Sequence, residues 1–77
     1  MKLPIVSGKD VAKVLLKEGF ILKKQKGSRM HFIKEQESKL LHVDVPIHGN
    51  KDLNTTVLMS IMRQSGYSRD DFIKLFR

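Results

Sequence analysis

Residues 20–46, FILKKQKGSRMHFIKEQESKLLHVDVP, decide the fold because three strand-like runs alternate there with two turn signals. We predict strands over residues 20–26, 29–35 and 40–46, since each run is rich in β-branched, aromatic or alternating side chains. Lys26-Gly27-Ser28 is a tight-turn signal, and residues 36–39 form a second, polar one. Connections this short make neighbouring strands antiparallel. Pro46 ends the third strand, because proline cannot donate a hydrogen bond to a ladder.

Alternation along the second and third strands assigns their side chains to two faces. The face toward the core is predicted to carry Met30, Phe32, Leu41, Val43 and Val45. The opposite face carries Arg29, His31, His42 and Asp44. If the hairpin pairs Glu35 with Leu40, counting back places His31 opposite Asp44. The same register pairs Phe32 with Val43, so both apolar faces stay together.

Capping residues and glycines place the helices around these strands. Ser7 can cap a first helix, with Asp10 as the reciprocal capping carboxylate and Gly19 at its end. The other predicted boundaries are Asn54 or Thr55 and Gly66 for a second helix, and Ser68 for a short last one. The predicted fold class is α+β, a two-layer α-β-β-β-α arrangement with a three-stranded antiparallel sheet packed on two helices, plus a short C-terminal helix. We expect a single domain over residues 1–77.

Size and charge restrict the function. A chain of 77 residues buries only about 60% of its unfolded surface, so a surface site is expected rather than a deep cleft. The net charge of +7, from 15 Lys and Arg against 8 Asp and Glu, favours an anionic polymer, although phospholipid or an acidic protein would satisfy it too. The absence of cysteine excludes disulfides, zinc knuckles and thiol chemistry. No apolar run approaches a membrane span, so we expect a soluble, cytoplasmic protein without a membrane partner.

His31 is the candidate catalytic residue. Imidazole titrates near neutral pH, and a strand side chain on the outer face reaches solvent. Neighbouring groups would hold a phosphate beside the ring, and the expected phosphate-binding and RNA-binding residues are Lys23, Lys24, Lys26, Ser28 and Arg29. Asp44, on the opposite strand, would orient the ring. The residues alone leave open the alternative that His31 is a surface histidine with no special task.

The candidate chemistry needs neither metal nor cofactor. RNA is cleaved without metal when a base takes the 2′-hydroxyl proton, an acid protonates the leaving oxygen and a cation stabilises the phosphorane. A metal site of His31, His42 and Asp44 is conceivable, but nothing in the spacing selects a metal, and we expect none. With Tyr67 as the single tyrosine and Phe32 assigned to the core, recognition through backbone and shape is expected instead of base stacking.

Three segments together resemble the HicA family of messenger-RNA interferase toxins, also called YcfA-like proteins. They are LPIVSGKDVAKVLLKEGF (3–20), KKQKGS (23–28) and HVDVPIHGNKDLNTTVLMSIMRQSGYSRDDF (42–72). The resemblance implies a fold like that of double-stranded RNA-binding domains and a role as the toxin of a type II toxin-antitoxin system. It further implies metal-independent cleavage of mRNA, and neutralisation by a HicB-like antitoxin that covers the active face. The oligomeric state is left open.

One position departs from the family pattern. The family's active histidine follows Gly-Ser directly, whereas Arg29 follows here and His31 comes two residues later. Both project from the same face, displaced along the strand by roughly 6 to 7 Å. A guanidinium binds phosphate but does not deprotonate, so we predict an endoribonuclease with His31 as acid or base and Arg29 as phosphate clamp. The alternatives are a non-catalytic RNA-binding module that lost the Gly-Ser-His signature, and an interaction subunit whose basic face serves only an acidic antitoxin.

Overall fold

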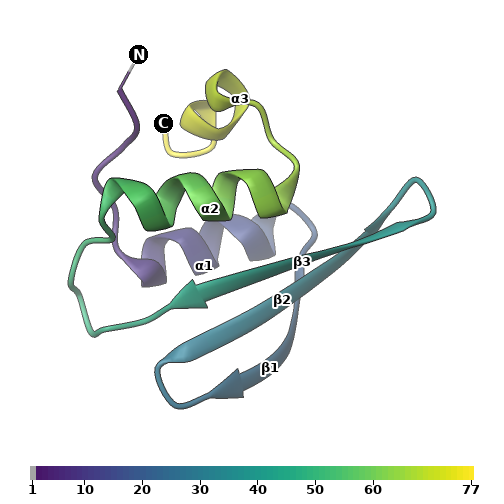
Figure 1. The fold of residues 1–77 in the computed structure, drawn as a ribbon, viewed down its shortest axis with the longest axis horizontal. Coiled ribbons are helices and arrows are strands. Elements are labelled where there is room, and N and C mark those ends of the chain that lie inside the picture. The colour runs from purple at the N-terminus through teal and green to yellow at the C-terminus, as the bar shows by residue number, and fades with distance from the viewer. Residues whose placement is uncertain (1) are drawn as a thin grey trace.

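Three helices and a three-stranded antiparallel sheet make up residues 2–77, the part of the chain that the computed structural model describes (Figure 1). Met1, the first residue of the expected domain, lies outside the described residues. In chain order the elements are α1 (Gly8–Lys17), β1 (Ile21–Lys26), β2 (Arg29–Gln36), β3 (Lys39–Pro46), α2 (Thr55–Ser65) and α3 (Arg69–Lys74). The α+β class and the arrangement like that of double-stranded RNA-binding domains are thereby confirmed. No helix within residues 2–77 has the length and hydrophobicity needed to cross a bilayer.

The sheet has the order β1-β2-β3, and both strand pairs are antiparallel. The register between β2 and β3 is the predicted one: His31 lies opposite Asp44, and Phe32 lies opposite Val43. Because side chains alternate with a period of two, this register sends the apolar residues to one face and the polar ones to the other. The outer face of the sheet is therefore free to carry a site.

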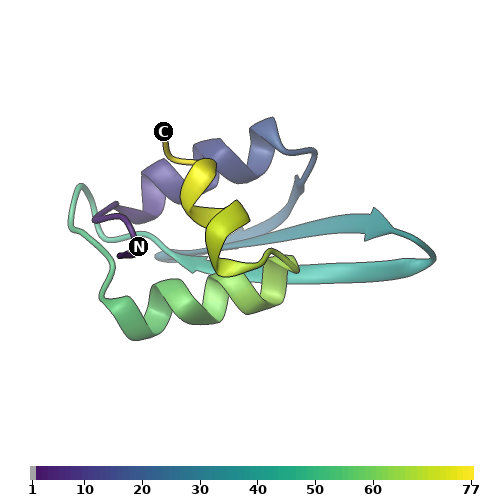
Figure 2. The same cartoon turned by 90° about the horizontal axis from the view of Figure 1, so that it is seen from above.

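The core lies between the inner face of the sheet and the helices. Its fully buried side chains come from every layer: Val11 and Leu15 of α1, Phe32, Val43 and Val45 of the sheet, Leu58 and Ile61 of α2, and Phe72 of α3. In Figure 2, α3 lies across the space between α1 and α2. Figure 1 places it on the side of these helices away from the sheet. The short last helix thus closes the end of the core.

Three strand boundaries differ from the sequence prediction: the start of β1, the end of β2 and the start of β3. Phe20 lies outside β1, because its amide hydrogen-bonds Leu15 O at 2.9 Å and its side chain is buried in the core. The β2–β3 turn contains only Glu37 and Ser38, with φ of 50° and 65°, because Gln36 and Lys39 already pair. Positive φ at both turn residues matches the right-handed twist of the strands, which favours this tight connection.

The predicted caps are confirmed at the three helix starts. Ser7 Oγ accepts from the Asp10 amide at 3.2 Å, and the Asp10 carboxylate accepts from the Ser7 amide at 3.0 Å. These bonds lower the pKa of Asp10 below its ordinary value, because they favour the ionised form. Asn54, rather than Thr55, caps α2, and Ser68 caps α3. Gly66 ends α2 with φ of 81°, a conformation that glycine adopts without strain.

Candidate functional site

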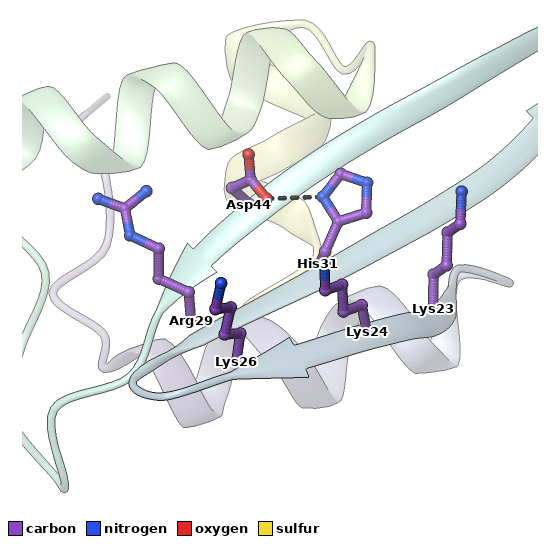
Figure 3. Close-up of a pocket in the computed structure, with 6 residues that line it drawn as sticks. All are labelled: Lys23, Lys24, Lys26, Arg29, His31 and Asp44. Atoms are coloured by element: carbon purple, nitrogen blue, oxygen red, sulfur yellow. Dashed lines mark hydrogen bonds and ion pairs between the residues drawn. The ribbon is translucent and has the colours of Figure 1, made fainter.

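A cationic pocket opens on the outer face of the sheet. Its lining residues are Lys23, Lys24, Lys26, Arg29, His31 and Asp44. In Figure 3 these side chains lie in front of the strands, while α1 lies behind them, so the pocket and the core occupy opposite faces. All but one of the predicted site residues are brought together here. Four permanent cations around one histidine make the pocket a place where a phosphate would be held beside an imidazole.

A β-bulge in β1 puts three lysines into this pocket. Leu22 pairs with Phe32 and Lys24 pairs with His31, so Lys23 is an extra residue that faces no partner on β2. Strict alternation would send Lys23 and Lys24 to opposite faces of the sheet. A bulge inserts one residue, increases the local twist and redirects the side chains around it. Both lysines therefore line the pocket, together with Lys26, which pairs with Arg29.

His31 is held by Asp44 across the strands. Nδ1 of His31 lies 2.6 Å from Oδ1 of Asp44, and Figure 3 shows the two side chains pointing toward one another. The Asp44 amide points away from β2 and donates to Oε1 of Gln64 on α2 at 3.0 Å. His31 and Asp44 are thus a non-hydrogen-bonded pair of the ladder, the kind in which side chains approach most closely. This geometry accounts for the short contact.

The second ring nitrogen of His31 is also engaged. Nε2 of His31 lies 3.1 Å from Nδ1 of His42, and the two ring centroids are 5.2 Å apart. His42 is two residues from Asp44 on β3, so it is the diagonal neighbour of His31 on the outer face. A carboxylate only accepts hydrogen bonds, so Nδ1 of His31 carries a proton. Asp44, His31 and His42 therefore form one continuous hydrogen-bonded chain.

Ser28, a predicted phosphate-binding residue, and His48, the third histidine, both lie apart from the pocket. Ser28 is in the β1–β2 turn and does not line the pocket; its carbonyl accepts from the Ile47 amide. His48 lines a separate hollow beside Lys51. Arg29 borders both the cationic pocket and this hollow, so it connects the two surfaces. The basic surface thus continues past the pocket toward the loop before α2.

Sequence reasoning missed the links that His42 and Gln64 make. The predicted alternation puts His42 on the outer face, and its diagonal position relative to His31 follows from the predicted register, so this contact could be found from the sequence. Gln64 is 20 residues from Asp44 in the chain, and no local pattern indicates their contact. Within residues 2–77, no group of three or more His, Asp or Glu side chains is arranged to hold a metal ion.

These features define a class of protein: a small α+β domain whose exposed sheet face carries a histidine and a carboxylate among cations. A family model described as the HicA toxin of bacterial toxin-antitoxin matches residues 8–67. The chain therefore belongs to the HicA toxin family, as the sequence resemblance predicted, and it is the toxin of a toxin-antitoxin system. Membership implies a cognate antitoxin partner. A search of curated proteins finds no match to this chain.

Proposed function

We propose that this toxin is an mRNA interferase that cleaves RNA without metal at the cationic pocket. The observation that carries the proposal is the His31–Asp44 pair in the pocket wall, with 2.6 Å between Nδ1 and Oδ1. A carboxylate that fixes a histidine ring beside a phosphate site supplies acid–base chemistry, the main requirement for cleavage by a 2′-hydroxyl. The cytoplasm, where mRNA is translated, is the proposed location.

The cations have a separate role in this proposal. Arg29 and Lys24 flank His31, one along β2 and one across on β1, so a phosphate between them would lie against the imidazole. Arginine can bind two phosphate oxygens at once, which orients the group as well as attracting it. Positive charge fixed beside the phosphate would also stabilise the additional negative charge of the phosphorane.

The same face fits the proposed HicB-like antitoxin. The net charge of +7 and the cationic lining favour an acidic partner surface over this pocket. An antitoxin bound there would exclude RNA from His31 simply by covering it. We expect purified antitoxin to suppress both RNA binding and cleavage at one antitoxin per toxin site.

The test is cleavage of a labelled single-stranded RNA in the presence of EDTA. His31→Ala should lower the rate by about 100-fold or more, the range that positioned acid–base groups contribute. Asp44→Asn should lower it less, because the ring keeps a hydrogen-bond partner but loses the negative charge. Asp70→Asn, an exposed aspartate of α3, is the matched control and should leave the rate unchanged. Circular dichroism should be the same for all variants.

Binding without cleavage would favour the non-catalytic module instead. The parent chain would then bind RNA in a salt-sensitive manner and show no product at any concentration. Arg29→His restores the Gly-Ser-His sequence, and a gain of cleavage from an inert parent would support that alternative. Full cleavage and full growth inhibition by His31→Ala would contradict the assignment of His31.

A further inference from the structure

Of the four ring nitrogens of His31 and His42, one has no hydrogen-bond partner among residues 2–77, and it belongs to His42. Both ring nitrogens of His31 are engaged, Nδ1 with Asp44 at 2.6 Å and Nε2 with His42 at 3.1 Å. On His42, Nδ1 is engaged with His31, whereas no residue within 2–77 hydrogen-bonds Nε2. A group that exchanges a proton with a substrate needs an unoccupied nitrogen within hydrogen-bond reach. In the hydrogen-bonded chain, that nitrogen is Nε2 of His42.

His42 is also the more exposed of the two histidines. The His31 side chain is 27% exposed and forms part of the pocket wall. His42 is exposed, and it lies on the side of His31 toward the β2–β3 turn, just outside the lining of the pocket. A phosphate held by the cations would thus lie against His31. The sugar next to that phosphate would lie beside His42.

Resting on the function proposed above, we propose that His42 is the catalytic residue that takes the proton from the RNA 2′-hydroxyl, with His31 as the positioning residue behind it. When His31 is neutral, its Nδ1–H is donated to Asp44 and its Nε2 accepts from Nδ1–H of His42. This tautomer leaves a lone pair on Nε2 of His42. The Asp44–His31 pair thereby selects the form of His42 that acts as a base.

The bonds and protons of this cleavage step are all accounted for by the RNA, the two histidines and water. The 2′-oxygen forms a bond to phosphorus, the bond from phosphorus to the 5′-oxygen breaks, and the 2′-hydroxyl proton moves to Nε2 of His42. The positive charge is shared along the chain, because the Nδ1 proton of His42 can pass to Nε2 of His31, whose ring donates to the Asp44 carboxylate. The leaving 5′-oxygen takes a proton from water, and the histidine pair returns its proton to the resulting hydroxide.

The test compares His42→Ala with His31→Ala on the same RNA in EDTA, with Leu40→Ala as matched control. Leu40 is 49% exposed and lies two residues before His42 on β3, so it shares the same face. We expect His42→Ala to lose about 100-fold or more in cleavage rate, as much as His31→Ala. Its affinity for a 2′-deoxy analogue should stay within about threefold of the parent, since His42 does not line the cationic pocket and the phosphate contacts remain. Leu40→Ala should cleave like the parent.

A positioning role for His31 has its own measurement. In His31→Gln, kcat should fall while KM for the RNA stays within about threefold of the parent, because the ring that selects the tautomer of His42 is lost but the cations that hold the phosphate remain. A merely structural role, in which the pocket is distorted, would raise KM as well. Added imidazole should rescue His42→Gly, because the position is open to solvent.

The outcomes separate this inference from the function on which it rests. If His42→Ala cleaves within about threefold of the parent while His31→Ala is inactive, then His31 itself exchanges the proton with the RNA. The inference about His42 is then wrong, and the proposed function stands. If the parent cleaves no RNA, both are wrong. Equal loss in both variants, with imidazole rescue of His42→Gly, supports the inference.

Discussion

The backbone amide of Asp44 donates to the side chain of Gln64 at 3.0 Å, which joins the outer edge of β3 to α2. This bond fixes the strand at the residue whose carboxylate holds His31. The orientation of the site therefore depends on a helix residue that does not itself line the cationic pocket.

Replacing Gln64 with alanine should loosen this anchor. The expected loss of stability is about 0.5–1.5 kcal/mol, the net contribution of one hydrogen bond, because water can reach the exposed edge of the strand. Cleavage should fall by a few fold as Asp44 gains freedom. Thermal unfolding and the RNA cleavage rate are the measurements, and Ser60→Ala, one turn earlier on α2, is the control. An unchanged rate would show that Asp44 needs no support from α2.

Adding one methyl group at Gly8 should destabilise the fold. A Cβ there would clash with the Pro46 carbonyl oxygen and lie 2.9 Å from Cδ1 of Ile47. The start of α1 lies directly against the end of β3, so the backbone itself must move. We expect Gly8→Ala to lose about 1–3 kcal/mol in urea unfolding, the range for overpacked sites. Lys9→Ala, at the next and exposed position, should stay close to the parent. A parent-like midpoint for Gly8→Ala would refute this close packing.

Tyr67 should titrate far above its ordinary range. Burial, then the charge of Glu18 and a 3.2 Å hydrogen bond to its carboxylate, raise the pKa of Tyr67 to about 12. A raised folded-state pKa favours the neutral phenol, so this contribution to stability is fully present below pH 10 and is lost as pH rises toward 12. The chain has one tyrosine and no tryptophan, so phenolate absorbance reports this group alone.

Two variants check that titration. Glu18→Gln should bring the absorbance midpoint part of the way back toward 10, because burial remains while the negative charge is gone. Tyr67→Phe should lose less stability than the parent between pH 10 and 12. A midpoint near 10 in the folded parent would show that Tyr67 is more solvated than its contacts indicate.

Lys24 should contribute to RNA binding through phosphate attraction. It lies directly opposite His31 in the cationic pocket. Lys24→Ala should weaken binding of a 2′-deoxy analogue and reduce the slope of log affinity against log salt by about 1, as for one lost phosphate contact. Fluorescence anisotropy at several salt concentrations measures this. Lys39→Ala, at the start of β3, removes the same charge away from the pocket and should leave the slope unchanged.

The sequence predicted most of the fold because local rules and burial agree. Phe32 and Val43 are both apolar at alternating positions, and a slip of the register by one residue would send one strand's apolar side chains to the outer face. The caps at Ser7 and Ser68 follow from short-range hydrogen bonds. Where tertiary packing decides, local rules were insufficient: Phe20 fits a strand pattern but is drawn into the core instead.

The candidate site could be predicted only in part. The pairing of His31 with Asp44 depends on register alone and was predictable. The bulge at Lys23 was not, since polar lysines on both sides give no alternation from which an extra residue could be recognised. The contact between Asp44 and Gln64 depends on how α2 docks beside β3, a long-range property that local patterns do not contain.

The lysines of β1 have a consequence for handling the protein. Among the described residues 2–77, β1 is at one edge of the sheet and pairs only with β2, and it exposes Ile21 and Leu22. An open edge with apolar side chains can pair with a strand of another molecule, and lysine is the residue that most often prevents this. Removing all the positive charge of β1 at once would therefore produce aggregation, which would look like loss of RNA binding. Single replacements, checked by light scattering, keep the two effects apart.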